Sequence, residues 1–407
     1  MEQIPYVIIG GGLASVAAAD AIRRRDKTGR LVLLSNETQA PYDRVPLSKG
    51  YLLGEVEPAQ IFLRPARFYE RNKVELRLGQ AATGLDVAAR TVTLADGQRL
   101  GFEKLLLATG GRPRRLSLPG AELAGIHYLR DLPDSDGIRQ GLPGARKAVV
   151  IGGGFIGCEL ATGLAQLGLE VTVVELTPGL LSLVLDPETS GFMETFLRQQ
   201  GVTVLTSTAA ARFLGAQGRV TGVATNTGLE LPADLVLVGV GIIPNTEIAA
   251  AAGLPVDNGV IVNEYLEAAP GIYAAGDIAR FYSPTLGHQL RVEHYDVALQ
   301  HGRVAGANMS GEQRAYTELP YFFSHMAGVH IDVVGELSRR QHTVRRGALQ
   351  AEPGFSQFYF AEGLLQAVLC INGDTAILQA AREHIAERRP VSDPEACADA
   401  LQAAVAS

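Results

Sequence analysis

The stretch KAVVIGGGFIGCELATGLAQLGLEVTVVE, from Lys147 to Glu175, decides the fold. It begins with an apolar, β-branched run, turns on three consecutive glycines and continues into an amphipathic segment that reaches about Leu167. A second apolar run, Val171 to Val174, ends directly before the carboxylate of Glu175. Strand, glycine turn, helix and strand in this order predict a β-α-β unit of the Rossmann type.

Three glycines of this stretch have separate tasks in binding a dinucleotide. Gly152 permits the tight turn, Gly154 lets the backbone approach a pyrophosphate, and Gly157 lets the helix pack against the strand. The start of the helix offers unpaired N–H groups and partial positive charge to the phosphates. Glu175 follows Gly154 by about 20 residues, where a carboxylate bonds both hydroxyls of an adenosine ribose. None of the next three residues is an Arg that could meet a 2′-phosphate, which favours NADH over NADPH. An ordinary glycine-rich turn is the alternative interpretation.

A second copy of this design lies near the N-terminus, in PYVIIGGGLASVAAADAIRRRDKTGRLVLLSNE, residues 5–37. Its glycine turn spans 10–12, Ser15 occupies the third small position, and Glu37 follows the second strand with Asn36 beside it. Two such units in one chain imply two dinucleotides. A tightly held flavin and an exchangeable nicotinamide cofactor would account for both.

The composition is that of a globular protein with two or three domains. The chain has 407 residues, of which 47% are apolar and 19% charged. We find no export signal near Met1 and no apolar run of the roughly 18 residues that a membrane helix needs, so we expect a cytoplasmic protein without a membrane partner. The three cysteines form no C-x-x-C pair, so neither a disulfide framework nor a metal site is expected. The net charge of −7 argues against nucleic acid as a partner.

Charged residues also gather in PYDRVPLSK, residues 41–49. The segment is too irregular for a strand or a helix, and one interpretation is a surface loop with solvated charges. The other interpretation relates it to the neighbouring dinucleotide unit. Arg44 and Lys49 would then meet the pyrophosphate and the isoalloxazine ring of a bound flavin.

One apolar strand closes each half of the chain. Residues 74–110 alternate like a meander that turns at Asp96-Gly97 and ends in KLLLATGGRP. Small residues at the end of that strand can touch a cofactor: Ala108, Thr109 and Gly110. The matching strand of the second half lies in ADLVLVGVGIIPN, which ends at Gly239 and Gly241.

The segment GVIVNEYLEAAPGIYAAGDIARF carries a candidate flavin ligand. Ile272 to Ala275 form a short strand, after which Gly276 lets Asp277 turn inward and accept hydrogen bonds from the ribityl hydroxyls. An N-cap aspartate before Ile278 is a compatible alternative. A helix from about Glu293 follows, and we expect its N-terminus to face the flavin ring and stabilise negative charge there.

The pattern changes after Pro320. The runs YFFSHMAGVHIDVVGEL, FSQFYF and LLQAVLCIN predict three antiparallel strands, followed by a helix from Thr375 to about Arg388 and a short helix from Asp393. Together they predict a third domain of the α+β class. Most of the apolar residues are expected to form its core, while Phe322-Phe323 is a candidate cap for the flavin ring.

With GGGLAS, PYDRVPLSK, LATGGRP, GGGFIGCE, YAAGDIA and RVEHYDVA in this order, the chain resembles the FAD- and NAD-dependent ferredoxin reductases of aromatic-ring dioxygenase and monooxygenase systems. Apoptosis-inducing factors, rubredoxin reductases and monodehydroascorbate reductases are their relatives. The resemblance covers residues 4 to about 340. It implies an α/β fold of the glutathione-reductase type, with two Rossmann-like dinucleotide-binding domains and a C-terminal α+β domain. The implied domains are an FAD domain of residues 1–110 and 243–318, an NAD domain of residues 111–242 and a C-terminal domain of residues 319–407.

Taken with the motifs, the resemblance implies the residues of both cofactor sites. Those at FAD are Gly10, Gly12, Leu13, Ala14, Asn36, Glu37, Arg44, Lys49, Ala82, Ala108, Thr109, Gly110, Arg112, Gly276, Asp277, Glu293, His294 and Phe323. Those at NAD are Gly152, Gly154, Phe155, Ile156, Gly157, Glu159, Glu175 and Gly241. Lys49 and Glu159 are implied as a catalytic pair near flavin N5 that holds the nicotinamide carboxamide and tunes the charge of the ring. Taken alone, Glu159 is more simply an acid in the first turn of a helix.

Three departures from the family pattern stand out. Val45 replaces the first proline of the family's R-P-P-L-S-K. Phe323 stands where most dioxygenase reductases and apoptosis-inducing factors carry Trp, and His325 stands where they carry Asp. The last two changes lie on the side where electrons would leave, so they bear on the identity of the electron acceptor.

The resulting hypothesis is an FAD-dependent NADH:ferredoxin-type reductase. NADH passes a hydride to flavin N5, and the electrons leave singly to a ferredoxin or a rubredoxin-like carrier. The absence of Cys near 41–49, where disulfide reductases keep their redox thiols, argues against dithiol chemistry, and Cys158 is more simply a packing residue. One alternative is reduction of a small acceptor, such as monodehydroascorbate, a quinone or oxygen. Another is a redox-sensing interaction protein like the apoptosis-inducing factors, and both a monomer and a homodimer are compatible with the sequence.

An acidic carrier would need a basic patch on this acidic chain. Arg64, Arg67 and Arg71 have the i, i+3, i+7 spacing of one helical face. A second group of arginines is Arg339, Arg340, Arg345 and Arg346. A solvated basic face without a partner is the alternative for both groups.

Overall fold

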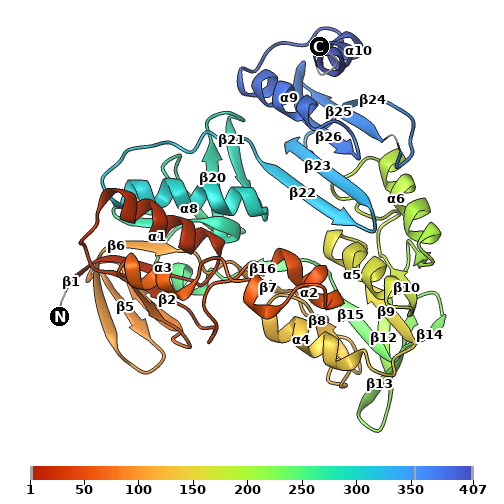
Figure 1. The fold of residues 1–407 in the computed structure, drawn as a ribbon, viewed down its shortest axis with the longest axis horizontal. Coiled ribbons are helices and arrows are strands. Elements are labelled where there is room, and N and C mark those ends of the chain that lie inside the picture. The colour runs from red at the N-terminus through yellow and green to blue at the C-terminus, as the bar shows by residue number, and fades with distance from the viewer. Residues whose placement is uncertain (1–2, 353, 405–407) are drawn as a thin grey trace. The chain divides into compact units, whose positions relative to one another are not determined.

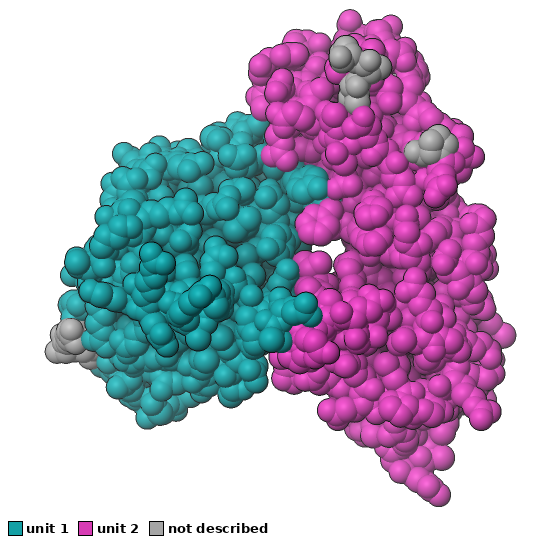
Figure 2. All heavy atoms as spheres, in the orientation of Figure 1, with its two compact units in different colours: residues 1–43, 59–112, 243–322 teal, residues 44–58, 113–242, 323–407 magenta. Residues whose placement is uncertain are grey.

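The computed structural model describes residues 3–352 and 354–404, and the chain divides into two compact units (Figure 2). Each unit is assembled from three separate segments. The segments are 1–43, 59–112 and 243–322 for unit 1, and 44–58, 113–242 and 323–407 for unit 2. The short segment 44–58 therefore belongs to the unit that contains the second glycine turn. The division into three domains stays a prediction.

Unit 1 is built on an eight-stranded sheet with a parallel centre (Figure 1). Its strands are β1 (Gln3–Ile9), β2 (Leu31–Leu34), β3 (Val74–Arg77), β4 (Ala82–Asp86), β5 (Thr91–Leu94), β6 (Arg99–Leu107), β18 (Glu267–Ala269) and β19 (Ile272–Ala274). Neighbouring strands in the order β19-β6-β1-β2-β3 are parallel, while β4, β5 and β6 form an antiparallel meander. All four residues of β2 are buried, as expected for a parallel strand with both faces covered.

Two helices of unit 1 pack closely against each other: α1 (Leu13–Arg25) and α8 (Tyr295–Met309). A Cβ atom on Gly302 would lie 2.2 Å from the Ala14 carbonyl oxygen, and one on Gly306 would lie 2.4 Å from the Ala18 carbonyl oxygen. Only glycine allows this approach, because any side chain there would overlap the backbone of α1. Figure 1 shows the two helices side by side next to the large sheet.

The remaining elements of unit 1 are short. They are α3 (Ala66–Arg71), α7 (Glu247–Ala251), the 3-10 helix η3 (Gly276–Ile278), β17 (Val260–Val262), β20 (Ala279–Ser283) and β21 (His288–Arg291). The last three strands form a small sheet in the order β17-β20-β21. The 3-10 helix η2 (Pro58–Gln60) and the strand pair β7 (Gly111–Pro113) and β16 (Ile242–Pro244) lie where the chain passes from one unit to the other.

Unit 2 contains the second parallel sheet, with the order β11-β10-β9-β15-β8. Its strands are β8 (Ile126–Tyr128), β9 (Lys147–Ile151), β10 (Glu170–Val174), β11 (Thr203–Leu205) and β15 (Leu235–Val238). The other elements of this region are α4 (Leu132–Gly141), α5 (Phe155–Gln166), α6 (Pro187–Gln199), β12 (Ala210–Ala216), β13 (Arg219–Thr225) and β14 (Glu230–Pro232). Val149 and Val236 of the parallel sheet share one core with Phe213 and Val223 of the antiparallel sheet β12-β13-β14.

The C-terminal part of unit 2 is a five-stranded sheet with two helices (blue in Figure 1). The sheet order is β22-β23-β26-β25-β24. These elements are β22 (Tyr321–Met326), β23 (Val329–Gly335), β24 (His342–Arg346), β25 (Phe355–Ala361), β26 (Leu364–Ile371), α9 (Ala376–Ala386) and α10 (Pro394–Ala403). The prediction of three strands is wrong, because a turn at Ala327-Gly328 splits the first run and HTVRR forms the additional strand β24. Both predicted helices are present.

The structure corrects three further local predictions. Residues 41–49 are not irregular throughout, because the 3-10 helix η1 (Val45–Ser48) begins with Pro46 in its first turn and leads into α2 (Gly50–Leu53). Asp277 is not an N-cap, since that position in η3 belongs to Ala275. The helix expected from Glu293 begins two residues later, as α8, with His294 as its N-cap. Across residues 3–352 and 354–404, no helix is both long enough and apolar enough to cross a bilayer.

A buried histidine in unit 1 predicts a pH dependence of stability. Burial lowers the pKa of His301 from 6.5 to about 3, and its ring lies edge-on against Phe281 and Tyr316. The unfolded chain therefore takes up a proton as the pH falls below 6.5, while the folded chain stays neutral until about pH 3. Stability should be full above pH 6.5 and fall on acidification, with a slope of up to about 1.4 kcal/mol per pH unit from this group.

Urea unfolding at a series of pH values between about 7 and 4 measures this slope. His301→Gln should flatten it, because glutamine does not titrate. His342→Gln is the control, since His342 is exposed on β24. An unchanged slope in His301→Gln would contradict the prediction.

Candidate functional site

The first glycine turn of unit 1 forms a cradle at the N-terminus of α1. Gly10 has a φ of +126°, and a Cβ atom there would lie 2.1 Å from the Ala108 carbonyl oxygen, so only glycine fits. Gly12 is the N-cap of α1, and a Cβ atom there would meet nothing within 4 Å. No side chain caps this helix and its first turn holds no acid. The free N–H groups and the open space suit the pyrophosphate of a dinucleotide.

The second glycine turn, in unit 2, repeats this geometry. Gly152 has a φ of +103° and lies too close to the Gly239 carbonyl oxygen for any side chain, at 2.3 Å from a Cβ atom. A Cβ atom on Gly157 would lie only 1.9 Å from the Gly152 carbonyl oxygen. Gly154 is the uncapped N-cap of α5 and again faces open space. The residues present therefore fit a second dinucleotide.

Glu175 lies at the end of β10, as the fingerprint requires. Its Oε2 accepts a hydrogen bond from the Gly153 N–H at 2.5 Å, and its Oε1 accepts from the N–H and hydroxyl of Thr177, both at 2.7 Å. Ser182 in turn donates to the Thr177 hydroxyl at 2.7 Å. The carboxylate is thus held beside the glycine turn, in the position where it can accept from ribose hydroxyls.

A buried ion pair in unit 2 joins Lys49 to Glu159. Lys49 Nζ lies 2.6 Å from Glu159 Oε1, and only 5% of Glu159 is exposed. Two hydroxyls complete the site, with Ser48 Oγ at 2.5 Å from Oε2 and Ser324 Oγ at 2.7 Å from Oε1. The alternative of a first-turn acid is wrong, because no acid lies in the first turn of α5 and the side chain is buried. Sequence reasoning missed both serines.

The N-terminus of α8 holds a neutral histidine in unit 1. Burial lowers the pKa of His294 to about 4, although the nearby Asp277 raises it. Its Nδ1 atom is buried and has no hydrogen-bond partner among the described residues. Arg291, which sequence reasoning missed, donates to the Asp277 carbonyl oxygen at 3.1 Å and pairs with Glu293 at 2.8 Å. An unsatisfied polar atom beside a helix N-terminus fits a bound polar group such as a flavin.

The other polar residues predicted at FAD make contacts within the protein. The Glu37 carboxylate follows β2 together with Asn36 and accepts a hydrogen bond from the Tyr42 hydroxyl. Arg112 pairs with Glu247 at 2.7 Å and donates to Asn245 at 2.8 Å. In unit 2, Arg44 donates to the Arg130 carbonyl oxygen at 2.8 Å.

The predicted site residues thus divide between the two units. Unit 1 contains Gly10, Gly12, Leu13, Ala14, Asn36, Glu37, Ala82, Ala108, Thr109, Gly110, Arg112, Gly276, Asp277, Glu293 and His294. Unit 2 contains Arg44, Lys49, Gly152, Gly154, Phe155, Ile156, Gly157, Glu159, Glu175, Gly241 and Phe323. Arg44 and Lys49 therefore share a unit with the second glycine turn, although both were expected at FAD.

The three cysteines are free. Cys158 is fully buried, with a pKa raised by burial and by the nearby Glu159 and Glu175, and Cys397 Sγ lies 3.9 Å from His384 Nε2. Burial also raises the pKa of Cys370 to about 11. In the described ranges, no cluster of three or more His, Cys, Asp or Glu side chains is placed to hold a metal ion.

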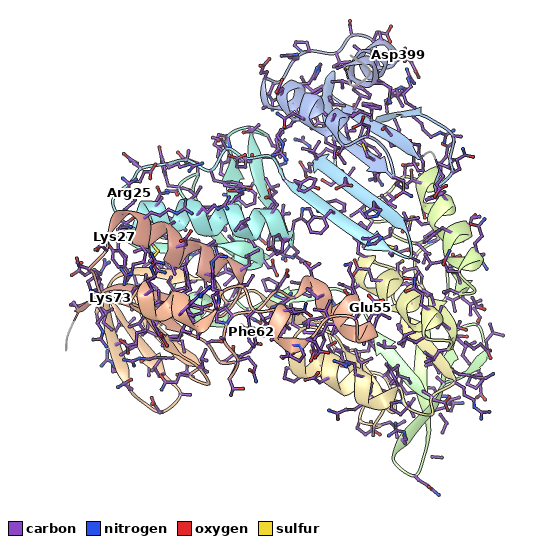
Figure 3. All side chains as sticks on the ribbon, viewed as in Figure 1. Arg25, Lys27, Glu55, Phe62, Lys73 and Asp399 are labelled. Carbon is purple, nitrogen blue, oxygen red and sulfur yellow. The ribbon has the colours of Figure 1, made fainter. Side chains whose placement is uncertain are left out.

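The two arginine groups differ in their surroundings. All three arginines of the first group are exposed, but Arg64 precedes α3 and stacks on Phe68, so the three do not share one helical face. The second group is engaged in ion pairs or backbone contacts. Its contacts are Arg339 with Glu362, Arg340 with the carbonyls of Val184 and Leu185, Arg345 with Glu188, and Arg346 with Glu395 and Asp399, the last labelled in Figure 3. This second group is therefore no free basic patch.

Comparison with known proteins agrees with the two dinucleotide cradles that the geometry indicates. Residues 4–302 match the family model described as pyridine nucleotide-disulphide oxidoreductase, and residues 321–403 match the one described as reductase C-terminal. The chain belongs to the pyridine nucleotide-disulphide oxidoreductase family. Membership explains why two glycine turns of the same geometry occur in one chain, each at the start of a helix that follows a parallel strand.

Within this family the chain is similar to reductases that serve small electron carriers. It is 36% identical to rhodocoxin reductase of Rhodococcus erythropolis, over 97% of this chain and 92% of that protein. It is 35% identical to the ferredoxin--NAD(+) reductase component of the anthranilate 1,2-dioxygenase system of Burkholderia cepacia, over 98% of both chains. The reductase in the covalent putidaredoxin reductase–putidaredoxin complex superposes with a TM-score of 0.92 at 34% identity, over 99% of both chains.

Proposed function

We propose that this chain is an FAD-dependent reductase that takes electrons from NADH and passes them to a small iron–sulfur protein or a rubredoxin. The Lys49–Glu159 pair carries the proposal, because an ammonium held against a buried carboxylate, in one unit with a nucleotide cradle, is suited to hydride transfer. Relatives named as reductases of rhodocoxin, ferredoxin and putidaredoxin support the choice of acceptor. We further propose a cytoplasmic location, where NADH is supplied.

Bound FAD supplies the chemistry, since it accepts electrons as a pair from NADH and donates them singly. The chain supplies binding and electrostatics. The α5 N-terminus and Gly154 hold the NADH pyrophosphate, and Glu175 accepts hydrogen bonds from the ribose hydroxyls. Lys49 donates a hydrogen bond to the nicotinamide carboxamide, and Glu159 holds the Lys49 ammonium in place. On the other cradle, Gly12 and the α1 N-terminus hold the FAD pyrophosphate.

The N-terminus of α8 provides the electrostatic support at FAD. His294 is neutral at physiological pH, because its burial lowers its pKa to about 4. It can therefore donate or accept a hydrogen bond without adding charge, while the dipole of α8 favours negative charge at this point. Asp277 is proposed to accept hydrogen bonds from the ribityl hydroxyls.

Anaerobic stopped-flow mixing tests the proposed function. The purified protein is mixed with NADH or with NADPH, and the flavin absorbance is followed. It is then mixed with a ferredoxin, a rubredoxin, a quinone and oxygen. We expect fast reduction by NADH, slower reduction by NADPH, and fast reoxidation by the ferredoxin or the rubredoxin. Fast reoxidation by quinone or oxygen alone would overturn the proposed acceptor.

The arginines of α3 predict the salt dependence of carrier docking. Replacing Arg67 and Arg71 together by Ala should raise the KM for an acidic carrier about tenfold at low salt, because both guanidinium groups are exposed and attract carboxylates. The same variant should lose most of the salt dependence of the rate. Arg345→Ala is the control, since Arg345 already pairs with Glu188. Equal effects of both changes would contradict docking at α3.

A further inference from the structure

The Glu159 carboxylate is held by three donors from two places in the sequence. Ser48 ends η1, Lys49 follows it directly, and Ser324 lies on β22. The Ser324 hydroxyl donates to Oε1 at 2.7 Å, beside the Lys49 ammonium at 2.6 Å, while the Ser48 hydroxyl donates to Oε2 at 2.5 Å. Each carboxylate oxygen therefore has a hydroxyl donor of its own. All of these groups belong to unit 2.

Because the Glu159 carboxylate is buried, its hydrogen bonding depends on these hydroxyls. Ser48 and Ser324 are each 3% exposed and Glu159 is 5% exposed, so water does not replace a lost donor easily. A buried carboxylate is stable only when it is paired and hydrogen-bonded, and an unmet acceptor there carries the full desolvation cost. The three donors thus satisfy the buried carboxylate and fix its orientation, and removing one of them leaves an acceptor site unmet.

Strand β22 directs the Ser324 side chain to its buried face and the side chains on either side of Ser324 to its exposed face. Successive side chains of a strand point to opposite faces. Ser324 is buried, whereas Phe323 and His325 on either side of it are exposed. Phe323 and His325 are also the positions that depart from the family pattern. Ser324 therefore ties the C-terminal sheet to the ion pair, independently of what the exposed face of β22 carries.

We propose that Ser48 and Ser324 are positioning residues that keep the Glu159 carboxylate directed at Lys49, which makes the C-terminal sheet a structural part of the NADH site. This inference rests on the proposed function, in which Lys49 binds the nicotinamide carboxamide. We assign neither serine a contact with a cofactor, because both act through Glu159.

Two readouts test this inference on the FAD-loaded protein. The first is the rate of reduction at saturating NADH. The second is the carboxylate stretching band of Glu159 in the infrared spectrum, identified by its absence in Glu159→Gln. In Ser324→Ala the rate should fall about tenfold and the infrared band should shift in frequency, since one hydrogen bond to a charged group is lost. Ser48→Ala should act in the same direction.

The chain offers matched controls. Ser356→Ala removes a buried hydroxyl of the same C-terminal sheet that faces Cys370, and Ser135→Ala removes one that donates to the Leu47 carbonyl oxygen of η1. Neither should lower the rate or shift the band. Ser324→Thr keeps the hydroxyl and should restore the wild-type values even if Ser324→Ala is less stable.

An unmoved infrared band in both Ser48→Ala and Ser324→Ala would overturn the inference. The same holds if Ser356→Ala moves the band equally. Should NADH fail to reduce the protein, the proposed function fails, yet the infrared band still decides whether the serines hold the Glu159 carboxylate by hydrogen bonds.

Discussion

Glu159→Gln should slow reduction of the protein by NADH about 100-fold, the typical loss when one charged group is removed from a preorganised site. Glutamine has the shape of glutamate, and its oxygen can accept from one of the two serines while its N–H donates to the hydroxyl of the other. It carries no charge, so the Lys49 ammonium loses the partner that lies 2.6 Å away. Because the Lys49 side chain is 24% exposed, water can partly solvate it. The fold should therefore survive while the position of Lys49 is lost.

Single-turnover stopped-flow kinetics at saturating NADH measures this effect, and thermal unfolding checks the fold. Glu194→Gln is the control, because Glu194 makes only a loose pair with Arg198, at 3.7 Å on the same helix. A rate within about threefold of wild type in Glu159→Gln would remove the Lys49–Glu159 pair from the mechanism.

Features that depend on neighbouring residues could be predicted from the sequence. The turn at Gly152 needs a positive φ, and the contact between Gly157 and the Gly152 carbonyl oxygen leaves no room for a side chain. Both requirements are met within six consecutive residues, so the residue types alone reveal them. The carboxylate of Glu175 follows for the same reason, since the length of the β-α-β unit determines where its second strand ends.

Features that depend on distant residues could not be predicted. Ser324 and Glu159 are separated by 165 positions, and nothing in the runs around them signals the hydrogen bond. Strand β24 was missed because HTVRR has little apolar character, and pairing with β25 stabilises it instead. The helical turn at Val45–Ser48 was missed because two loop-forming features, a proline and a charge cluster, dominate that segment.

The spacing of the first three arginines in the sequence predicted a shared helical face that the structure does not have. The i, i+3, i+7 pattern of Arg64, Arg67 and Arg71 assumes one helix, but α3 begins only at Ala66. The arginines of the second group are already engaged in ion pairs or backbone contacts, as in the ion pair of Arg346 with Asp399. Charge patterns therefore indicated where basic residues occur, whereas the tertiary structure determines which of them face a partner.

Gly157→Ala should destabilise unit 2 by about 3 kcal/mol, the upper end of the cost of overpacking a core. Its Cβ atom would lie 1.9 Å from the Gly152 carbonyl oxygen, which is backbone and cannot rotate away. The helix α5 must then move off the β9 turn, and the N–H groups that bind the pyrophosphate move with it. NADH binding should be lost together with stability.

Gly154→Ala separates these two effects, because the same methyl group there meets no protein atom within 4 Å. Its φ of −77° is accessible to alanine, so the unfolding midpoint should stay at the wild-type value. The added methyl group occupies the space assigned to the pyrophosphate, and the Kd for NADH should rise about 10-fold or more. Urea unfolding and fluorescence titration with NADH measure the two quantities. An unchanged Kd in Gly154→Ala would show that the pyrophosphate does not lie over this turn, whereas a stable Gly157→Ala variant would show that α5 can shift without cost.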